Sequence, residues 1–171
     1  MNPYSVYLAG FMSEKKLKET TEWRLRVRDF YVRKGWPIVF LDPWNGKEVA
    51  TVTDNGLKSS VPGKALVDRD YSSVKTSDIV IANLDTFGEE RPPVGTLSEI
   101  VWAWTLKKPV ILISNVPHYV YHPFLKEFSS WIVDSVDTLL KDRVLDYFFK
   151  GVHGAVYTPE DIITMRKDEF K

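Results

Sequence analysis

Cysteine is absent from this chain of 171 residues, which excludes a disulfide scaffold, a zinc ribbon, an iron–sulfur site and catalysis by a thiolate. Histidine occurs only three times, as His118, His122 and His153. None of the three has metal-ligand spacing with another histidine or with a pair of carboxylates. We therefore expect no metal and no other cofactor.

Neither sign of charge dominates, because 23 basic residues are balanced by 23 acidic ones. Such a chain has no overall field that would collect nucleic acid or an anionic membrane. No apolar run approaches the roughly 20 residues of a membrane span, and the first residues lack the pattern of a signal peptide. We expect a cytoplasmic protein that handles a small molecule, with neither nucleic acid nor membrane as a partner.

Several catalytic signatures are missing as well. There is no Gly-x-Ser-x-Gly elbow, no phosphate loop that ends in Gly-Lys-Ser/Thr, and no Gly-x-Gly-x-x-Gly fingerprint. Any catalysis must then rest on carboxylates and tyrosine.

Apolar residues make up 44% of the chain, enough to bury a core. Wholly apolar runs predict strands at residues 6–10, 36–41, 78–84, 110–114 and 131–133. Helical spacing predicts helices at residues 13–34, 64–75, 95–107, 124–129, 136–149 and 159–167. Ser13 is a candidate cap for the first helix, Gly35 a candidate stop, and turn signals make residues 44–63 a long loop or a small excursion.

Alternation of apolar strands with helices predicts an α/β fold, a flavodoxin- or Rossmann-like three-layer sandwich with a five-stranded, mainly parallel sheet. Ligands in such folds bind beyond the carboxyl ends of the strands. Gly10, Asp42, Asp85 and the loop at Gly95 all fall there.

Glu99 is the most informative carboxylate. We place it in the first turn of a helix that opens at Gly95, where free N–H groups and the helix dipole favour an anion. An ionised carboxylate in an apolar pocket would be a nucleophile. An ordinary first-turn acid that serves the helix end fits the same spacing.

Three further residues have two interpretations each. Asp70, on the helix before the third strand, either faces the cleft, where it would suit an acid that protonates a leaving group, or faces the solvent. Asp85 closes that strand and either accepts bonds from ligand hydroxyls or forms an Asx turn. Tyr7, on the first strand, is a site residue or a core tyrosine.

Taken together, these segments resemble the nucleoside 2-deoxyribosyltransferase family. The resemblance covers residues 4–157 and rests on Val6-Tyr7-Leu8-Ala9-Gly10, Leu41-Asp42-Pro43, Asp70-Tyr71-Ser72-Ser73-Val74-Lys75-Thr76-Ser77-Asp78-Ile79, Ala82-Asn83-Leu84-Asp85, Gly95-Thr96-Leu97-Ser98-Glu99, Lys108-Pro109-Val110 and Gly154-Ala155-Val156-Tyr157. We accordingly expect one domain over residues 1–157, with residues 158–171 as its helical extension.

The resemblance implies transfer of 2-deoxyribose between the bases of 2′-deoxynucleosides in nucleotide salvage. Glu99 matches the nucleophile, Asp70 the acid/base and Tyr7 the tyrosine that holds the nucleophile. The expected partners are a deoxynucleoside and a free base. Trp44 follows Asp42-Pro43 and would form an apolar wall against a base, although simple loop packing explains it equally well.

The sequence departs from the family's pattern at two positions that would contact the substrate. The family commonly has an aspartate six residues before the nucleophile, and related N-glycosidases have a serine; this chain has Pro93. Glu89, Glu90 or Asp85 could substitute for the aspartate, whereas Arg91 could bind a phosphate. His122 stands where the family's neighbouring subunit would supply an amide for the sugar 5′-hydroxyl.

The family shares active sites between subunits, so we expect a homo-oligomer, a dimer or a hexamer. Six tryptophans fit buried interfaces, and the helix at residues 99–107, with Trp102 and Trp104, is the candidate contact face. Two other functions remain open. One is hydrolysis of a 2′-deoxynucleoside or its 5′-monophosphate, with Ser98 and Arg91 as phosphate ligands; the other is a non-catalytic nucleotide-binding module.

Overall fold

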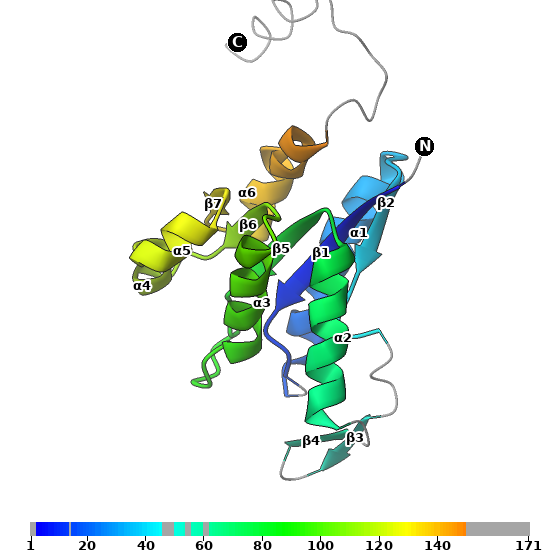
Figure 1. Ribbon diagram of the computed structural model, residues 1–171, viewed down its shortest axis with the longest axis vertical. Coiled ribbons are helices and arrows are strands. Elements are labelled where there is room, and N and C mark those ends of the chain that lie inside the picture. The colour runs from blue at the N-terminus through cyan, green and yellow to red at the C-terminus, as the bar shows by residue number, and fades with distance from the viewer. Residues whose placement is uncertain (1–2, 14, 46–49, 54–55, 60–61, 150–171) are drawn as a thin grey trace, which may run out of the picture.

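A five-stranded parallel sheet lies between two layers of helices, and a separate two-stranded hairpin projects at one end (Figure 1). The computed structural model describes residues 3–13, 15–45, 50–53, 56–59 and 62–149. The strands are β1 (Tyr4–Gly10), β2 (Ile38–Leu41), β3 (Ala50–Thr53), β4 (Gly56–Ser59), β5 (Ile79–Asn83), β6 (Val110–Ile113) and β7 (Trp131–Val133). The helices are α1 (Leu17–Arg33), α2 (Gly63–Thr76), α3 (Val94–Thr105), α4 (Pro117–Val120), α5 (Pro123–Phe128), α6 (Val136–Lys141) and the 3-10 helix η1 (Val144–Phe148).

The order of the main sheet is β2-β1-β5-β6-β7, and every pair of neighbouring strands is parallel. Strands β5 and β6 are buried along their whole length, as is β1 from Val6 onward. This is why the sequence shows unbroken apolar runs instead of alternation. The predicted fold class is confirmed.

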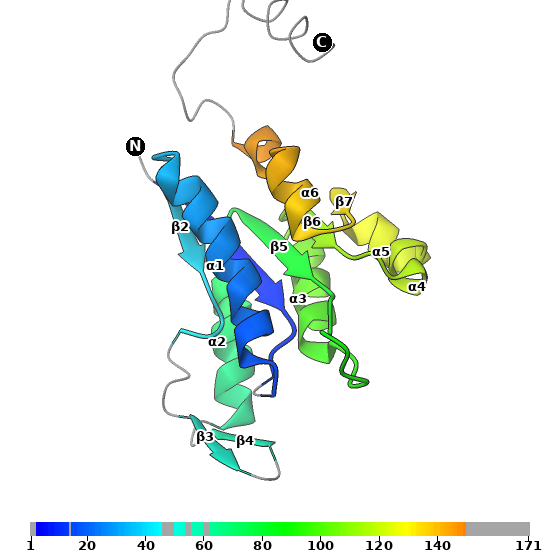
Figure 2. The same ribbon diagram turned by 180° about the vertical axis from the view of Figure 1, so that it is seen from behind.

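Two apolar cores lie on opposite faces of the sheet. Helices α2 and α3 cover one face, and α1 and α6 cover the other (Figures 1 and 2). Side chains alternate along β1, so that Val6 and Leu8 pack toward α1 while Tyr7 and Ala9 pack toward α2 and α3. Tyr7 is thereby committed to the α2/α3 face.

The ends of α1 were predicted half correctly. Gly35 follows the helix with φ of +68°, as expected for a residue that ends a helix. Ser13 is not the cap, because α1 begins at Leu17 and its N-cap residue is Lys16. The Ser13 hydroxyl instead donates to the Glu89 carboxylate in the loop after β5.

The expected excursion at residues 44–63 contains the antiparallel hairpin β3–β4, which lies at the end of the molecule where α2 begins (Figure 1). The helix expected at residues 136–149 divides into α6 and η1, separated by Arg143 in the left-handed region at φ of +51°. The expected helix at residues 159–167, the segment 154–157 and the extension 158–171 lie outside the described residues. Within the described ranges, none of the helices combines the length and apolarity needed to cross a bilayer.

Candidate active site

The side chains of Tyr7 and Glu99 meet in the α2/α3 core. Tyr7 donates its hydroxyl hydrogen to Oε1 of Glu99 over 2.6 Å. Glu99 reaches this position because it shares the inward stripe of α3 with Thr96, Ile100 and Ala103. Tyr7 is 1% exposed and Glu99 6% exposed, so the hydrogen bond is shielded from bulk water.

Burial raises the pKa of Tyr7 above its usual value, and the negative charges of Glu99 and Asp70 raise it further. The phenol therefore stays protonated and acts as a donor. A donor of this kind stabilises the ionised form of a carboxylate and fixes its orientation. The negative charge of Asp70 is therefore near enough to Tyr7 to raise the pKa of its phenol.

The expected position of Glu99 in the first turn of its helix is wrong. Helix α3 begins at Val94, after Pro93 as N-cap residue, and its first turn contains no acidic residue. Proline is tolerated just before a helix because no backbone N–H is needed there. Glu99 lies in the second turn, so the free N–H groups of the helix end do not hold it; the Tyr7 hydroxyl does.

Arg24 is a buried cation next to this pair that the sequence analysis missed. It comes from α1 on the opposite face and is 1% exposed. Its Nε donates to the carbonyl of Leu8 (3.2 Å) and its Nη2 to the carbonyl of Gly10 (2.9 Å). Burial lowers the pKa of Arg24, whereas the negative charges of Asp42 and Glu99 act in the opposite direction.

Arg24 thus ties the end of β1 to the end of β2, since its Nε also lies 3.5 Å from Oδ1 of Asp42. One signal of its role was available in the sequence. Arg24 falls on the buried stripe of α1 with Thr20, Trp23 and Val27, a place where an arginine needs partners.

Gly10 and Asp42, both predicted to bind substrate, have structural contacts here. A Cβ atom at Gly10 would lie 2.7 Å from Trp23 and 3.0 Å from Arg24, so only glycine fits. Oδ1 of Asp42 accepts a hydrogen bond from the backbone N–H of Trp44 over 2.9 Å. Trp44 itself is half-buried, and its indole Nε1 finds no partner among the described residues.

Asp70 lies on α2, with 17% of its side chain exposed, and is paired with the neighbouring Arg69. Arg69 donates to Oδ1 of Asp70 from Nη2 (2.8 Å) and from Nε (3.1 Å). The same guanidinium donates to the carbonyls of Pro43 and Asn45, each over 2.9 Å. Arg69, also missed in the sequence, therefore fixes Asp70 against the loop that follows β2.

The other three predicted substrate contacts, Asp85, Gly95 and His122, are all exposed. Asp85 is exposed, and its Oδ1 accepts from the backbone N–H of Phe87 over 2.7 Å, which is the predicted Asx-turn alternative. Gly95 is exposed in the first turn of α3. His122 is exposed just before α5.

The residues considered for phosphate binding have partners within the chain. Arg91 donates to the carbonyl of Met12 over 2.7 Å, and its guanidinium lies 4.7 Å from the centre of the Phe11 ring. The Ser98 hydroxyl donates to the carbonyl of Val94 over 2.9 Å. On the predicted contact face, the Trp104 side chain is exposed; self-association stays a prediction.

The sequence profile of the nucleoside 2-deoxyribosyltransferase family matches residues 6–149. Comparison with curated proteins found no match. Among solved structures, the chain is similar to CMP N-glycosidase BcmB from Clostridium botulinum, with 23% identity, a TM-score of 0.51, and 85% of this chain and 99% of that chain covered. It is also similar to BlsM, with 15% identity, a TM-score of 0.56, and coverages of 92% and 99%.

A 2-desoxiribosyltransferase from Leishmania mexicana is a further match, with 21% identity and a TM-score of 0.48. That match covers 67% of this chain, and the chain spans 66% of the length of the Leishmania mexicana protein. At these identities the matches to BcmB and BlsM establish a shared fold alone.

Proposed function

The chain belongs to the nucleoside 2-deoxyribosyltransferase family, an enzyme family that acts on N-glycosidic bonds, and from this premise we propose that it transfers 2-deoxyribose between nucleobases. The observation that carries the proposal is the buried hydrogen bond of 2.6 Å between Tyr7 and Glu99. The negative charge of Asp70, which raises the pKa of Tyr7, supports it. A retaining glycosyl transfer uses two carboxyl groups in different surroundings, one as the nucleophile and one as the acid and base.

In the first half of the reaction, a carboxylate oxygen of Glu99 attacks the anomeric carbon of the deoxynucleoside. A C–O bond forms to Glu99 as the C–N bond to the base breaks, and the base nitrogen takes the electron pair. Asp70 in its acid form delivers a proton to the leaving base, which is otherwise a poor leaving group. The sugar remains covalently bound to Glu99.

Tyr7 is a positioning residue in this mechanism. Its raised pKa keeps the phenol protonated, so it donates to Glu99 and does not compete as a base. Because Glu99 is 6% exposed, a fixed donor replaces the water that would otherwise orient the carboxylate.

In the second half, a nitrogen of an incoming base attacks the anomeric carbon and Glu99 departs as a carboxylate. Asp70 now removes the proton from the incoming base. The ionised form of Asp70 that this step needs is the form paired with Arg69 in the unliganded chain. We assign the wall against the base to Trp44, which the Asp42 carboxylate positions through its backbone N–H.

Hydrolysis is the second candidate, with water in place of the incoming base. One comparison favours it: the chain is similar over 85% of its length to CMP N-glycosidase BcmB, a protein named for action on a nucleotide. Pro93, the buried N-cap residue of α3, offers neither the carboxylate common in transferases nor the serine of related N-glycosidases, so this position favours neither reaction. A nucleoside 5′-monophosphate would then be a substrate in place of the free nucleoside.

The test incubates the purified protein with deoxyinosine, with and without free adenine, and follows the products by chromatography. Transfer predicts deoxyadenosine only when adenine is present. We expect Glu99→Gln to lower the rate by about a thousandfold or more, as loss of a nucleophile does. Glu127→Gln, an exposed change of the same kind on α5, should keep full activity.

Release of hypoxanthine at the same rate without adenine would establish the hydrolase instead. If deoxyinosine is inert, the same assay with deoxyinosine 5′-monophosphate separates a nucleotide hydrolase from a protein without glycosidic activity. Inertness toward both would contradict the proposal and favour the nucleotide-binding module.

A further inference from the structure

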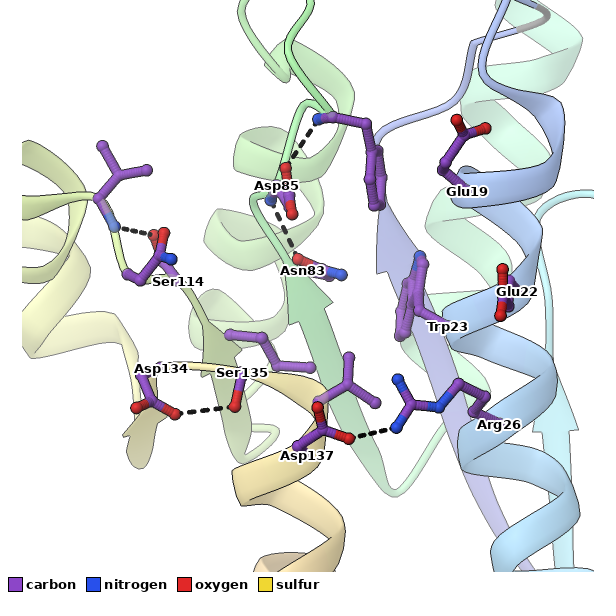
Figure 3. A pocket seen from close by; sticks show the side chains of 15 residues that line it. Glu19, Glu22, Trp23, Arg26, Asn83, Asp85, Ser114, Asp134, Ser135 and Asp137 are labelled. Carbon is purple, nitrogen blue, oxygen red and sulfur yellow. Dashed lines mark hydrogen bonds and ion pairs between the residues drawn. The ribbon is translucent and has the colours of Figure 1, made fainter.

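A cavity of about 380 Å³ opens on the α1/α6 face of the sheet, opposite the Tyr7–Glu99 pair (Figure 3). Its walls come from the first half of α1, the segments that follow β5 and β6, and the start of α6. Tyr7, Asp70 and Glu99 do not line it. Cavities that hold small molecules begin at about 300 Å³, so the space suits a ligand the size of an amino acid.

The walls carry an excess of negative charge. The cavity is lined by one guanidinium, Arg26, and by the five carboxylates of Glu19, Glu22, Asp85, Asp134 and Asp137. Arg26 is already paired with Asp137. Hydrogen bonds from the hydroxyls of Thr138 and Ser135 lower the pKa of Asp134, so its charge persists at neutral pH. Such walls attract a cation.

A metal ion does not match this arrangement. Among the residues that the structure describes, no three histidine or carboxylate side chains are grouped closely enough to hold one ion. The carboxylates instead surround an open space, as Figure 3 shows for Glu22 on one side and Asp134 on the other. Separated carboxylates suit a cation with several donor groups on an organic frame.

Two donors among the residues that line the cavity, of which the Trp23 indole is a buried one without a partner, call for an acceptor on the same ligand. Asn83 is 4% exposed; its Oδ1 accepts from the N–H of Asp85 over 3.0 Å, and its amide nitrogen points toward Trp23 (Figure 3). No described residue accepts from that nitrogen. Trp23 is also 4% exposed, and its indole Nε1 lacks a partner among the described residues. Buried donors without acceptors are costly, and a carbonyl oxygen would remove that cost.

We propose that this acidic cavity binds a small organic cation, a guanidinium compound that also carries a carbonyl group. The carboxylates at the rim hold the cation, and Asn83 with Trp23 donates to the carbonyl oxygen. Since the acidic cavity shares no residue with the catalytic group Tyr7, Asp70 and Glu99, this site is independent of the proposed transfer reaction.

Calorimetric titration of the full chain with L-argininamide tests the proposal. L-citrullinamide is the matched control ligand, because it has the same shape with a neutral ureido group in place of the guanidinium. We expect saturable binding of argininamide at one site and a dissociation constant at least about tenfold higher for citrullinamide.

Single charge removals locate the site. Glu22→Gln and Asp134→Asn should each raise the dissociation constant of argininamide about two- to fivefold, the effect of one exposed ion pair. Glu127→Gln, away from the cavity, and Glu99→Gln should leave it unchanged. Absence of saturable binding up to about 10 mM, equal affinities of the two ligands, or loss of binding in Glu99→Gln alone would each overturn the proposal.

Discussion

The two faces of the sheet differ in how far their carboxylates are exposed to water. On the α2/α3 face, the carboxylate of Glu99 is buried and held by the Tyr7 hydroxyl over 2.6 Å. On the α1/α6 face, the carboxylates that line the acidic cavity stand at an open rim, and Arg26 and Asp137 pair with 45% and 79% of their side chains exposed. The acidic cavity lies at the carboxyl ends of β5 and β6, whereas Tyr7 lies in the middle of β1.

The difference shows what burial does to a charged group. A carboxylate removed from water needs fixed partners, and those partners then determine its orientation and its state of ionisation. A carboxylate at an open rim keeps its hydration. It therefore attracts a cation electrostatically but does not fix the orientation of that cation. The first arrangement is suited to reaction and the second to weak, charge-selective binding.

The largest expected effect is a difference in stability between variants of two arginines on α1, Arg24 and Arg26. Arg24→Met removes a guanidinium that is 1% exposed and leaves Asp42 and the carbonyls of Leu8 and Gly10 without their donor. We expect the free energy of unfolding to fall by about 3–5 kcal/mol, as it does when one member of a buried ion pair is removed. Urea denaturation measures it.

The matched control for this change is Arg26→Met, which breaks the exposed pair with Asp137. Exposed pairs contribute about 0–1 kcal/mol, so this variant should unfold close to the parent midpoint. Equal losses in the two variants would show that burial does not determine how much an ion pair contributes to stability in this protein.

A smaller effect is expected from Tyr7→Phe, which removes only the donor to Glu99. Hydrogen bonds to charged groups contribute about 1.5–3 kcal/mol, which corresponds to a fall in kcat/KM of about 10- to 100-fold. The acidic limb of the pH–rate profile should also move to higher pH, because the ionised carboxylate loses a stabilising donor. Steady-state assays from pH 4 to 9 measure both.

Tyr4→Phe, on the same strand but packed toward the α1/α6 core, is the control and should change neither quantity. A fall in rate without any movement of the acidic limb would mean that Tyr7 shapes the cavity without acting on the charge of Glu99.

Strands could be predicted from the sequence where the burial of consecutive residues alone determines them. The run Trp131-Ile132-Val133 became β7 with the predicted bounds, and residues 110–114 and 78–84 became β6 and β5 within two residues. Periodicity reports burial directly, so these strands needed no information about distant parts of the chain. The start of α3 was predicted within one residue, but Glu99 was assigned to the first turn although it is the sixth residue of the helix.

Long-range polar contacts were not predictable. The proximity of Tyr7 to Glu99 followed from a family resemblance and not from spacing. Arg24 and Arg69 donate mainly to backbone carbonyls, at Leu8 and Gly10 in one case and at Pro43 and Asn45 in the other. Any residue can offer a carbonyl, so such contacts leave no pattern of side chains in the sequence.

The smallest expected effect is the loss of stability at alkaline pH that is caused by one buried tyrosine on each face of the sheet. Burial raises the pKa of Tyr7, and burial together with the charge of Asp146 raises that of Tyr31. Above the ordinary value of 10.0, the unfolded chain loses these protons while the folded chain keeps them. The folded state then binds more protons, so the free energy of unfolding falls as pH rises, by up to about 1.4 kcal/mol per pH unit for each tyrosine.

Urea denaturation at pH 8, 10 and 11 should show this decline, and Tyr7→Phe or Tyr31→Phe should each make it less steep by a similar amount. Tyr147→Phe is the control, because Tyr147 is 71% exposed and lies outside both cores. A weaker dependence in Tyr31→Phe alone would mean that the phenol of Tyr7 ionises readily in the folded chain. In that case Tyr7 would not be a permanent donor to Glu99. The two tyrosines would also differ in how strongly burial raises their pKa values, although both are buried.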